Sequence, residues 1–142
     1  MLRVVVDPGV LLSGLIAPAG PPGALMERWS RGIVQFVTSP LLIQEFTDVA
    51  LRPKFRTWFS EQEARDVARL LAAATEAHVD VETEVPLPRD GGDAYLVHLT
   101  VEAQAFALVT GDKELRDHAR TSGLRILTPV ETLDILQEWE QR

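Results

Sequence analysis

The sequence predicts an α/β fold, a three-layer α/β/α sandwich with a mostly parallel central sheet, formed by a single domain over residues 1–142. Two observations support this prediction. Short apolar runs, several of them rich in β-branched residues, alternate with segments of helical periodicity, and that alternation is typical of parallel sheets. The chain also contains no internal repeat, low-complexity tract or linker. At 142 residues it is long enough to bury one proper core.

The first elements are predicted from apolar runs and from breaks in them. Residues 2–6 form a short run that is apolar on both faces, as expected of a buried parallel strand. Residues 10–16 continue as a helical turn or two, and the Pro- and Gly-rich stretch 17–23 breaks the chain. We expect a short helix over 24–31 and the second strand over 33–38.

The middle of the chain carries two helix-start signals. Ser39 followed by Pro40 is an N-cap with proline at the first helical position, and apolar residues at helical spacing follow up to residue 50. Residues 52–55 interrupt this helix. The capping box of residues 60–63 starts a long helix that runs through 64–77. A short strand is then expected over residues 79–81.

The last third repeats the alternation of strand and helix. Residues 84–92, with their prolines and glycines, are predicted to be a loop. A second capping box, residues 128–131, is expected to open the final helix. The predicted elements are a helix over 93–103, a strand over 106–109, a helix over 113–121, a strand over 125–127 and a last helix to about residue 140.

Composition and charge exclude several classes of protein. Hydrophobic residues make up 46% and charged residues 25%, as in ordinary globular domains. Apolar stretches are too short for a membrane span, and the start is not a secretory signal, so a cytoplasmic protein without a membrane partner is expected. Without cysteine, neither a disulfide nor a thiolate metal site can form. The net charge of −7 disfavours broad electrostatic binding of nucleic acid. This net charge is compatible with an enzyme that binds phosphates only at a local site.

Four acidic residues fall where an α/β enzyme places its site. Asp7 closes the first apolar run, and Asp112 follows the run 105–109 after Thr110 and Gly111. Glu45 and Asp93 stand near the starts of two predicted helices. Carboxylates that follow the carboxyl ends of parallel strands collect along one edge of the sheet. Crowded carboxylates attract a hard divalent cation such as Mg²⁺ or Mn²⁺, which indicates metal-assisted phosphodiester chemistry.

Each of these carboxylates also has a purely structural interpretation. Asp7, Asp93 and Asp112 each stand where a side chain could cap a helix, for about 1 kcal/mol apiece. Glu45 could lie on a solvated helix face, although apolar neighbours place it beside the apolar stripe. Capping and metal binding are compatible, because a helix N-terminus and a cation both favour the ionised carboxylate. The functional interpretation rests on all four residues occurring together.

Other residue types give no comparable pattern. His78, His98 and His118 are widely spaced and are expected to be ordinary surface or hydrogen-bonded histidines. Neither a Ser-His-Asp arrangement, nor a Walker loop, nor a dinucleotide fingerprint is present in the sequence. The three tryptophans are expected to pack in the core or at an interface, with base stacking as the less favoured alternative; they are Trp29, Trp58 and Trp139.

Taken in order, six fragments make the chain resemble a PIN domain, in the branch described as toxin components of bacterial and archaeal toxin–antitoxin pairs. The resemblance runs nearly from end to end. The fragments are residues 4–15 with Asp7, 39–45 with Glu45, 52–55, 89–96 with Asp93, 108–115 with Asp112, and 126–129.

That resemblance implies an α/β/α sandwich and a Mg²⁺- or Mn²⁺-dependent endoribonuclease. The catalytic and metal-binding positions of the family fall on Asp7, Glu45, Asp93 and Asp112, which would hold one or two cations that activate water against RNA. Thr110 would orient the adjoining carboxylate, and Glu114 stands where many relatives have an extra acid. The resemblance also implies an RNA substrate, a possible antitoxin protein as partner, and a homodimer or higher homo-oligomer.

The chain departs from the family in two places. The family follows its first Asp with Thr or Ser and then Asn or Ser, whereas this chain has Pro8 and Gly9, and the stretch before Asp93 holds fewer acids. The departure leaves a second hypothesis open, a PIN-fold binding or scaffold protein with weakened or lost catalysis. A haloacid dehalogenase-type phosphatase would need Asp at position 9, and a receiver domain would need Lys after its last strand. With all four carboxylates present, we favour the nuclease.

Overall fold

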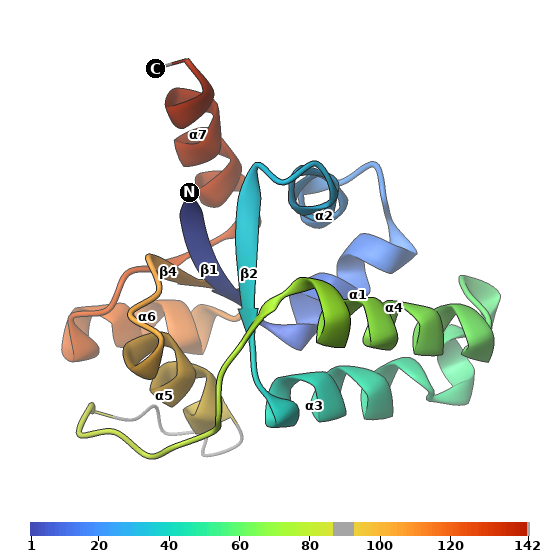
Figure 1. Cartoon of the computed structure of the whole chain (residues 1–142), viewed down its shortest axis with the longest axis horizontal. Helices are drawn as coiled ribbons and strands as arrows, with labels where there is room; N and C mark the ends of the chain where they lie inside the picture. Colours follow the sequence, from blue (N-terminus) through green and yellow to red (C-terminus); the bar gives the residue numbers. More distant parts are fainter. Residues whose placement is uncertain (87–92, 142) are drawn as a thin grey trace.

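A five-stranded parallel sheet forms the centre of the molecule (Figure 1). The structure is a computed structural model and describes residues 1–86 and 93–141, apart from the side chains of 119–121. The strand order is β3-β2-β1-β4-β5, and every neighbouring pair is parallel. The strands are β1 (Leu2–Val6), β2 (Val34–Thr38), β3 (Glu76–Ala77), β4 (Ala107–Val109) and β5 (Ile126–Leu127). The predicted α/β fold with a mostly parallel sheet is confirmed.

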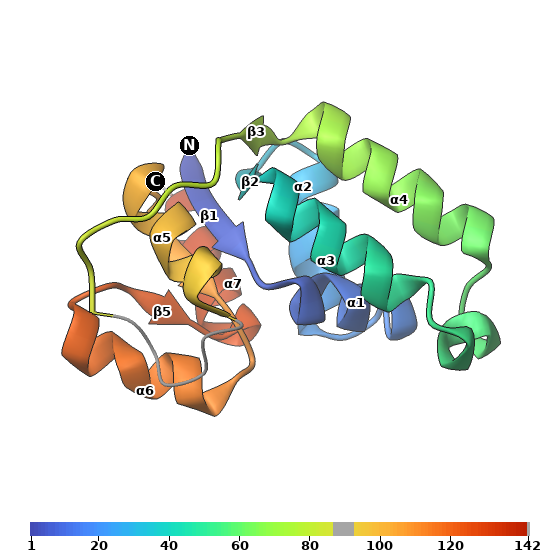
Figure 2. The ribbon, with the colours of Figure 1, turned by 90° about the horizontal axis from the view of Figure 1, so that it is seen from below.

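Helices cover the sheet on both faces (Figure 2). Helix α5 packs on β1 and β4, while α2 and α7 pack against each other on the opposite face. The α3–α4 pair extends away from the sheet beside α1. The helices are α1 (Pro8–Ile16), α2 (Pro21–Ser30), α3 (Pro40–Ala50), the 3₁₀ helix η1 (Pro53–Thr57), α4 (Glu61–Ala74), α5 (Ala94–Glu102), α6 (Lys113–Ser122) and α7 (Pro129–Glu140).

The core lies on both faces of the strands β1 and β4. In β1, Val4 and Val5 are fully buried, and in β4, Leu108 is fully buried as well. The apolar run on both faces of β1 is therefore explained, because a central parallel strand meets helices on each side. Phe36 of β2 is also buried and stacks on Trp29 of α2 at 5.0 Å between ring centroids. These contacts fix β1 at the middle of the sheet. Asp7, which follows β1 directly, is fixed there with it.

Two helices begin earlier than predicted because proline occupies their first turns. Helix α1 starts at Pro8 and α2 at Pro21, where the sequence predicted starts at 10 and 24. Proline is well suited to the first helical position, since it has no N–H group to satisfy there. Gly23 belongs to α2 and packs so closely on the preceding turn that a Cβ would lie 2.1 Å from Pro18 O. The last three residues of the Pro- and Gly-rich stretch, 21–23, thus form the start of a helix.

The third strand was predicted in the wrong place. Helix α4 ends at Ala74 and not at residue 77 as predicted, and β3 follows as Glu76–Ala77, paired with Val37 and Thr38. The predicted strand at residues 79–81 is absent from the structure, and Val79 there is 75% exposed. Thr75 ends the helix in an extended conformation, and its hydroxyl bonds to that of Thr38 at 2.6 Å. This threonine pair joins the chain to the sheet at Thr75, so the strand forms before the apolar residues of the segment 79–81.

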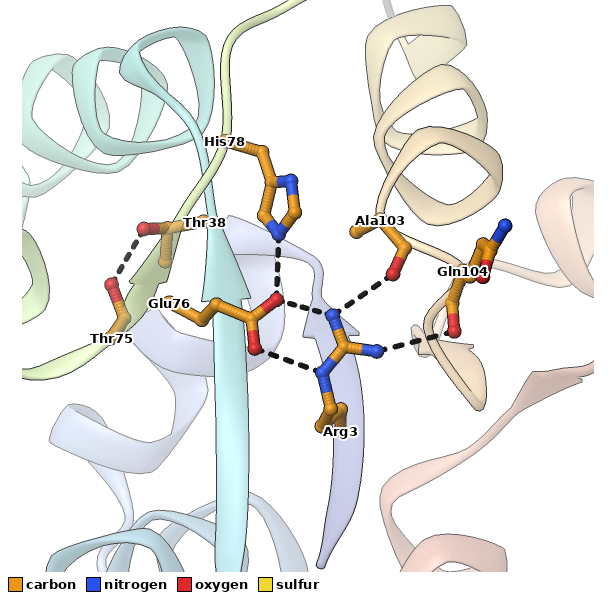
Figure 3. A network of polar contacts seen from close by, with 7 residues as sticks. All are labelled: Arg3, Thr38, Thr75, Glu76, His78, Ala103 and Gln104. Atoms are coloured by element: carbon orange, nitrogen blue, oxygen red, sulfur yellow. Dashed lines mark hydrogen bonds and ion pairs between the residues drawn. The ribbon is translucent and has the colours of Figure 1, made fainter.

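An ion-pair network crosses the face of β2 and connects β1 to β3 (Figure 3). The guanidinium of Arg3 donates two hydrogen bonds to the carboxylate of Glu76, and further bonds to Ala103 O and Gln104 O at the end of α5. His78 Nε2 lies 2.6 Å from the same carboxylate. The bonds from Arg3, followed by that from His78, lower the pKa of Glu76 to about 2. The network ties the short edge strand to the sheet centre.

The remaining predictions of elements agree closely with the structure. The predicted strands over 33–38, 106–109 and 125–127 are confirmed to within about two residues, the usual uncertainty of boundaries. The same holds for the helices over 93–103 and 113–121 and for the last helix to about residue 140. Both capping boxes are present, at Ser60 and Thr128. Of the predicted loop 84–92, residues 87–92 lie outside the described residues.

Within the described residues, no single helix is long and apolar enough to span a membrane; α1 and α2 pass that test only as a pair, and they meet at 99°.

Candidate active site

Two of the predicted acidic residues follow neighbouring strands at the carboxyl end of the sheet. Asp7 follows β1 and Asp112 follows β4, and these strands are neighbours in register, with Val6 opposite Val109. The Asp7 N–H donates to Val109 O at 2.9 Å, which fixes the first residue beyond β1 against the end of β4. The edge predicted from the sequence is therefore formed by these two strands, as in other open α/β sheets.

Thr110 joins the two segments through its hydroxyl. Its Oγ1 donates to Asp7 Oδ2 at 2.8 Å and accepts from the Asp112 backbone N–H at 3.0 Å. The side chain is fully buried, so this hydroxyl has a fixed orientation. Thr110 was expected to orient the adjoining carboxylate, but the carboxylate that it holds is that of Asp7, from the other strand.

The capping alternative is correct for two of the acids and wrong for the third. Asp7 Oδ1 accepts from Gly9 N at 2.9 Å at the start of α1, and Asp112 Oδ1 accepts from Glu114 N at 2.9 Å at the start of α6. Asp93 occupies the N-cap of α5, but its side chain makes no capping hydrogen bond to that helix. Glu114, at the position where many relatives have an extra acid, is exposed and donates its backbone N–H to Asp112.

Glu45 is hydrogen-bonded to Tyr95, a residue that was not predicted from the sequence to belong to the site. Tyr95 of α5 donates a hydrogen bond from Oη to Glu45 Oε2 of α3. Burial raises the pKa of Tyr95 above its usual value, and so do the hydrogen bond to Glu45 and the negative charges of Glu45, Asp7 and Asp93. One phenol therefore experiences three of the four predicted carboxylates. The only signal in the sequence was that Tyr95 follows Asp93 by two residues.

The four carboxylates are not gathered into a ready-made metal centre. Among the residues that the structure describes, no group of three Asp, Glu or His side chains is close enough to hold an ion. The histidines are engaged elsewhere, as expected. His78 bonds to Glu76, His98 accepts from Thr83 N at 2.8 Å, and His118 lies 2.6 Å from Pro86 O.

A cavity of about 530 Å³ opens beside Asp7 and Asp112. Both carboxylate residues line it, together with Gly9 and Ser13 of α1 and with Gly111. The rest of its lining is apolar and comes from the starts of three helices: Val10, Pro21, Pro22, Pro129 and Val130. The site thus combines an acidic edge with an apolar hollow.

A parallel sheet with acidic residues after β1 and β4 defines an open α/β domain with a candidate site at the carboxyl ends of its strands, and the comparison of sequences identifies its family. Residues 3–114 match the model of the PIN domain family. The chain belongs to the PIN-domain family, whose members are generally nucleases.

Known relatives place the fold and leave the activity open. An uncharacterised protein of Methanocaldococcus jannaschii is 28% identical over 116 residues, which cover 80% of this chain and 73% of the relative. The structure of VapBC2 from Rickettsia felis, bound to a DNA fragment from its promoter, aligns with a TM-score of 0.60 at 10% identity, over 89% of this chain and 98% of the other. A domain of a functionally unknown M. jannaschii protein aligns with a TM-score of 0.55 at 16% identity, over 89% of each chain. At these identities the structural matches show the fold alone.

Proposed function

We propose that this protein is a metal-dependent endoribonuclease that hydrolyses phosphodiester bonds of single-stranded RNA. The observation that carries the proposal is the grouping around Tyr95 and Thr110. Tyr95 is hydrogen-bonded to Glu45, and the charges of Asp7 and Asp93 contribute to its raised pKa. Thr110 is hydrogen-bonded to both Asp7 and the backbone of Asp112. Membership of a family of nucleases supports the same conclusion.

The donor set fits Mg²⁺ or Mn²⁺ by its chemistry. Asp7, Glu45, Asp93 and Asp112 offer only carboxylate oxygens, the ligands that hard divalent cations prefer. Because the described side chains form no three-ligand cluster, binding an ion requires other carboxylates to move toward Asp7, which Thr110 and Gly9 hold in place. When bound, the cation supplies Lewis-acid chemistry, making water a stronger nucleophile near neutral pH and offsetting charge on the phosphate.

The residues of the chain have separate tasks in this reaction. Asp7, Glu45, Asp93 and Asp112 would hold the cation. Thr110 limits the rotation of the Asp7 carboxylate through its 2.8 Å bond to Oδ2, leaving Oδ1 on Gly9 N. Tyr95 holds the Glu45 carboxylate through its hydrogen bond and is protonated at neutral pH, as tyrosine ordinarily is, with its pKa raised further by burial and by that bond. These contacts orient the ligands before substrate arrives.

The partners and compartment are part of the same proposal. The fold shared with VapBC2 of Rickettsia felis supports a role as the toxin of a toxin–antitoxin pair, with a small antitoxin protein as partner. We also infer a cytoplasmic homodimer or higher homo-oligomer. The exposed side chain of Trp139 in α7, 42% accessible beside Phe106, offers apolar surface for such an assembly.

The decisive experiment compares Asp93→Asn with wild type in Mn²⁺-dependent cleavage of single-stranded RNA. Asn has the shape of Asp but lacks the charge that a hard cation needs, so cleavage should be lost while the thermal melting curve is retained. Asp134→Asn, an exposed change of the same kind on α7, is the matched control and should cleave at the wild-type rate. Full activity in Asp93→Asn would refute the assignment of this carboxylate.

A further inference from the structure

We propose that the apolar cavity beside Asp7 and Asp112 is a nucleobase subsite, which receives a base adjoining the phosphodiester to be cut. This inference rests on the proposed ribonuclease function and makes its substrate contact specific. The cavity has a volume of about 530 Å³. That size lies within the range of small-molecule sites and accommodates one nucleoside.

Its position is continuous with the acidic edge. Asp7 and Asp112 line the cavity and belong to the set that would hold the cation at the phosphate. A strand of RNA whose phosphate lies at these carboxylates must place the neighbouring nucleoside within reach of the same hollow. The subsite thus adjoins the proposed reaction centre and shares Asp7 and Asp112 with it.

The lining chemistry selects a base over a phosphate. Beyond the two carboxylate residues, the lining consists of valines, prolines, glycines and Ser13, and none of its described residues is cationic. Inside the cavity, where no cation would lie between the charges, Asp7 and Asp112 would repel an anionic phosphate, whereas the face of a base is neutral and gains from contact with apolar groups. The aliphatic rings of the prolines offer flat surfaces for such contact.

One polar group in the cavity can contribute base recognition. The Ser13 hydroxyl donates to Gly9 O at 2.9 Å, so its proton is used within the helix. A hydroxyl oxygen carries two lone pairs, and these can accept from an amino or imino N–H of a base. Ser13 is exposed and lines the cavity, so an incoming base can reach it.

The test combines a change in the protein with a change in the RNA. Val130 is 52% exposed at the start of α7, so Val130→Ser should fold normally. An abasic nucleotide is placed at each position around the cleavage site in turn. At one position only, the abasic RNA should raise the wild-type KM by about tenfold, as expected for loss of a base from an apolar pocket. Val130→Ser should raise KM for intact RNA by about fivefold, because apolar contact is lost.

The interaction between the two changes decides the inference. With RNA that is abasic at the sensitive position, Val130→Ser and wild type should have equal KM values, because the contact is already gone. Val79→Ser, the same change at a more exposed valine outside this cavity, is the control and should match wild type on every substrate. RNA cleavage with no sensitive position, or equal effects of Val130→Ser on intact and abasic RNA, would overturn the subsite alone. No RNA cleavage by wild type with Mn²⁺ would overturn the proposed function, and the subsite with it.

Discussion

The Thr110 hydroxyl at the end of β4 donates a 2.8 Å hydrogen bond to Asp7 Oδ2 at the end of β1, across 103 residues of sequence. The same oxygen accepts from the backbone of Asp112. One buried side chain therefore sets both the rotation of the first carboxylate and the path of the chain toward the last. Such a contact determines how well the acidic edge is organised before any ligand binds.

Replacing this hydroxyl should separate site organisation from folding. Thr110→Val keeps the shape but removes both hydrogen bonds, so RNA cleavage should fall about 10–100-fold. The Asp112 N–H loses its acceptor, which should cost about 1–3 kcal/mol in the free energy of unfolding. Thr110→Ser retains the hydroxyl and should restore most of the activity. Cleavage assays and urea unfolding of both variants measure these effects, and equal activity of the Val and Ser variants would contradict the prediction.

Tyr95→Phe should weaken metal binding without unfolding the protein. The change removes the hydrogen bond to Glu45 and leaves the ring in place. Loss of a group that orients a metal ligand typically costs about 10–100-fold in affinity, and we expect the Mn²⁺ dissociation constant to rise accordingly. Titration calorimetry with Mn²⁺ measures this, and the melting temperature of the metal-free variant is the control. An unchanged affinity would mean that Tyr95 only fills space.

Gly9→Asn should increase activity if the Pro8–Gly9 departure limits the site. Gly9 is not among the positive-φ glycines, and a Cβ built on it meets Asp7 Oδ1 at an ordinary 3.5 Å, so an asparagine fits. A polar group beside Asp7 should raise Mn²⁺-dependent cleavage by about tenfold. Gly9→Ala adds the Cβ without the amide and controls for backbone effects. If Gly9→Asn folds well but gains nothing over Gly9→Ala, Gly9 does not limit the rate, and the scaffold hypothesis gains weight.

Mn²⁺ should raise the melting temperature of the wild-type protein. A ligand that binds only the folded state stabilises it by about 2.7 kcal/mol at 100 times its dissociation constant, or about 5–10 °C for a domain of this size. Relief of repulsion among Asp7, Asp93 and Asp112 contributes to the gain. Differential scanning fluorimetry measures the shift, with sodium chloride at matched ionic strength as control. The shift should shrink in Asp93→Asn, and equal shifts would place the ion elsewhere.

The ion pair of Arg3 and Glu76 should make stability fall in acid. The folded pKa of Glu76 is lowered from 4.5 to about 2, so its contribution is present above the unfolded pKa and is lost as pH falls from 4.5 toward 2. Arg3→Met removes the main cause, so the difference in unfolding free energy between neutral pH and about pH 3 should be smaller in the variant than in wild type. Arg65→Met, at an exposed position on α4, should retain the wild-type dependence. Urea unfolding at the two pH values provides the measurement, and an Arg3→Met protein as acid-sensitive as wild type would disprove the link.

The sequence sufficed for strand ends and for helices that begin with a capping box. The positions of Asp7 and Asp112 follow from strand ends in a parallel sheet, and both capping boxes were read directly. The partnership of Tyr95 with Glu45 was not predictable, because it depends on how α3 and α5 are placed relative to each other. Likewise β3 consists of Glu76 and Ala77, which have no strand signal of their own and are held by neighbours distant in sequence.

The placement of β1 at the middle of the sheet has a consequence for biosynthesis. The first strand emerges from the ribosome before both of its neighbours, and the β4 partner arrives roughly a hundred residues later. A nascent chain that stops short of Thr110 has β1 with one unpaired edge and Asp7 without its orienting hydroxyl. Such a fragment also lacks Asp112. A domain of this design completes its acidic edge only after most of its chain has been translated, so incomplete products do not carry the full set of carboxylates.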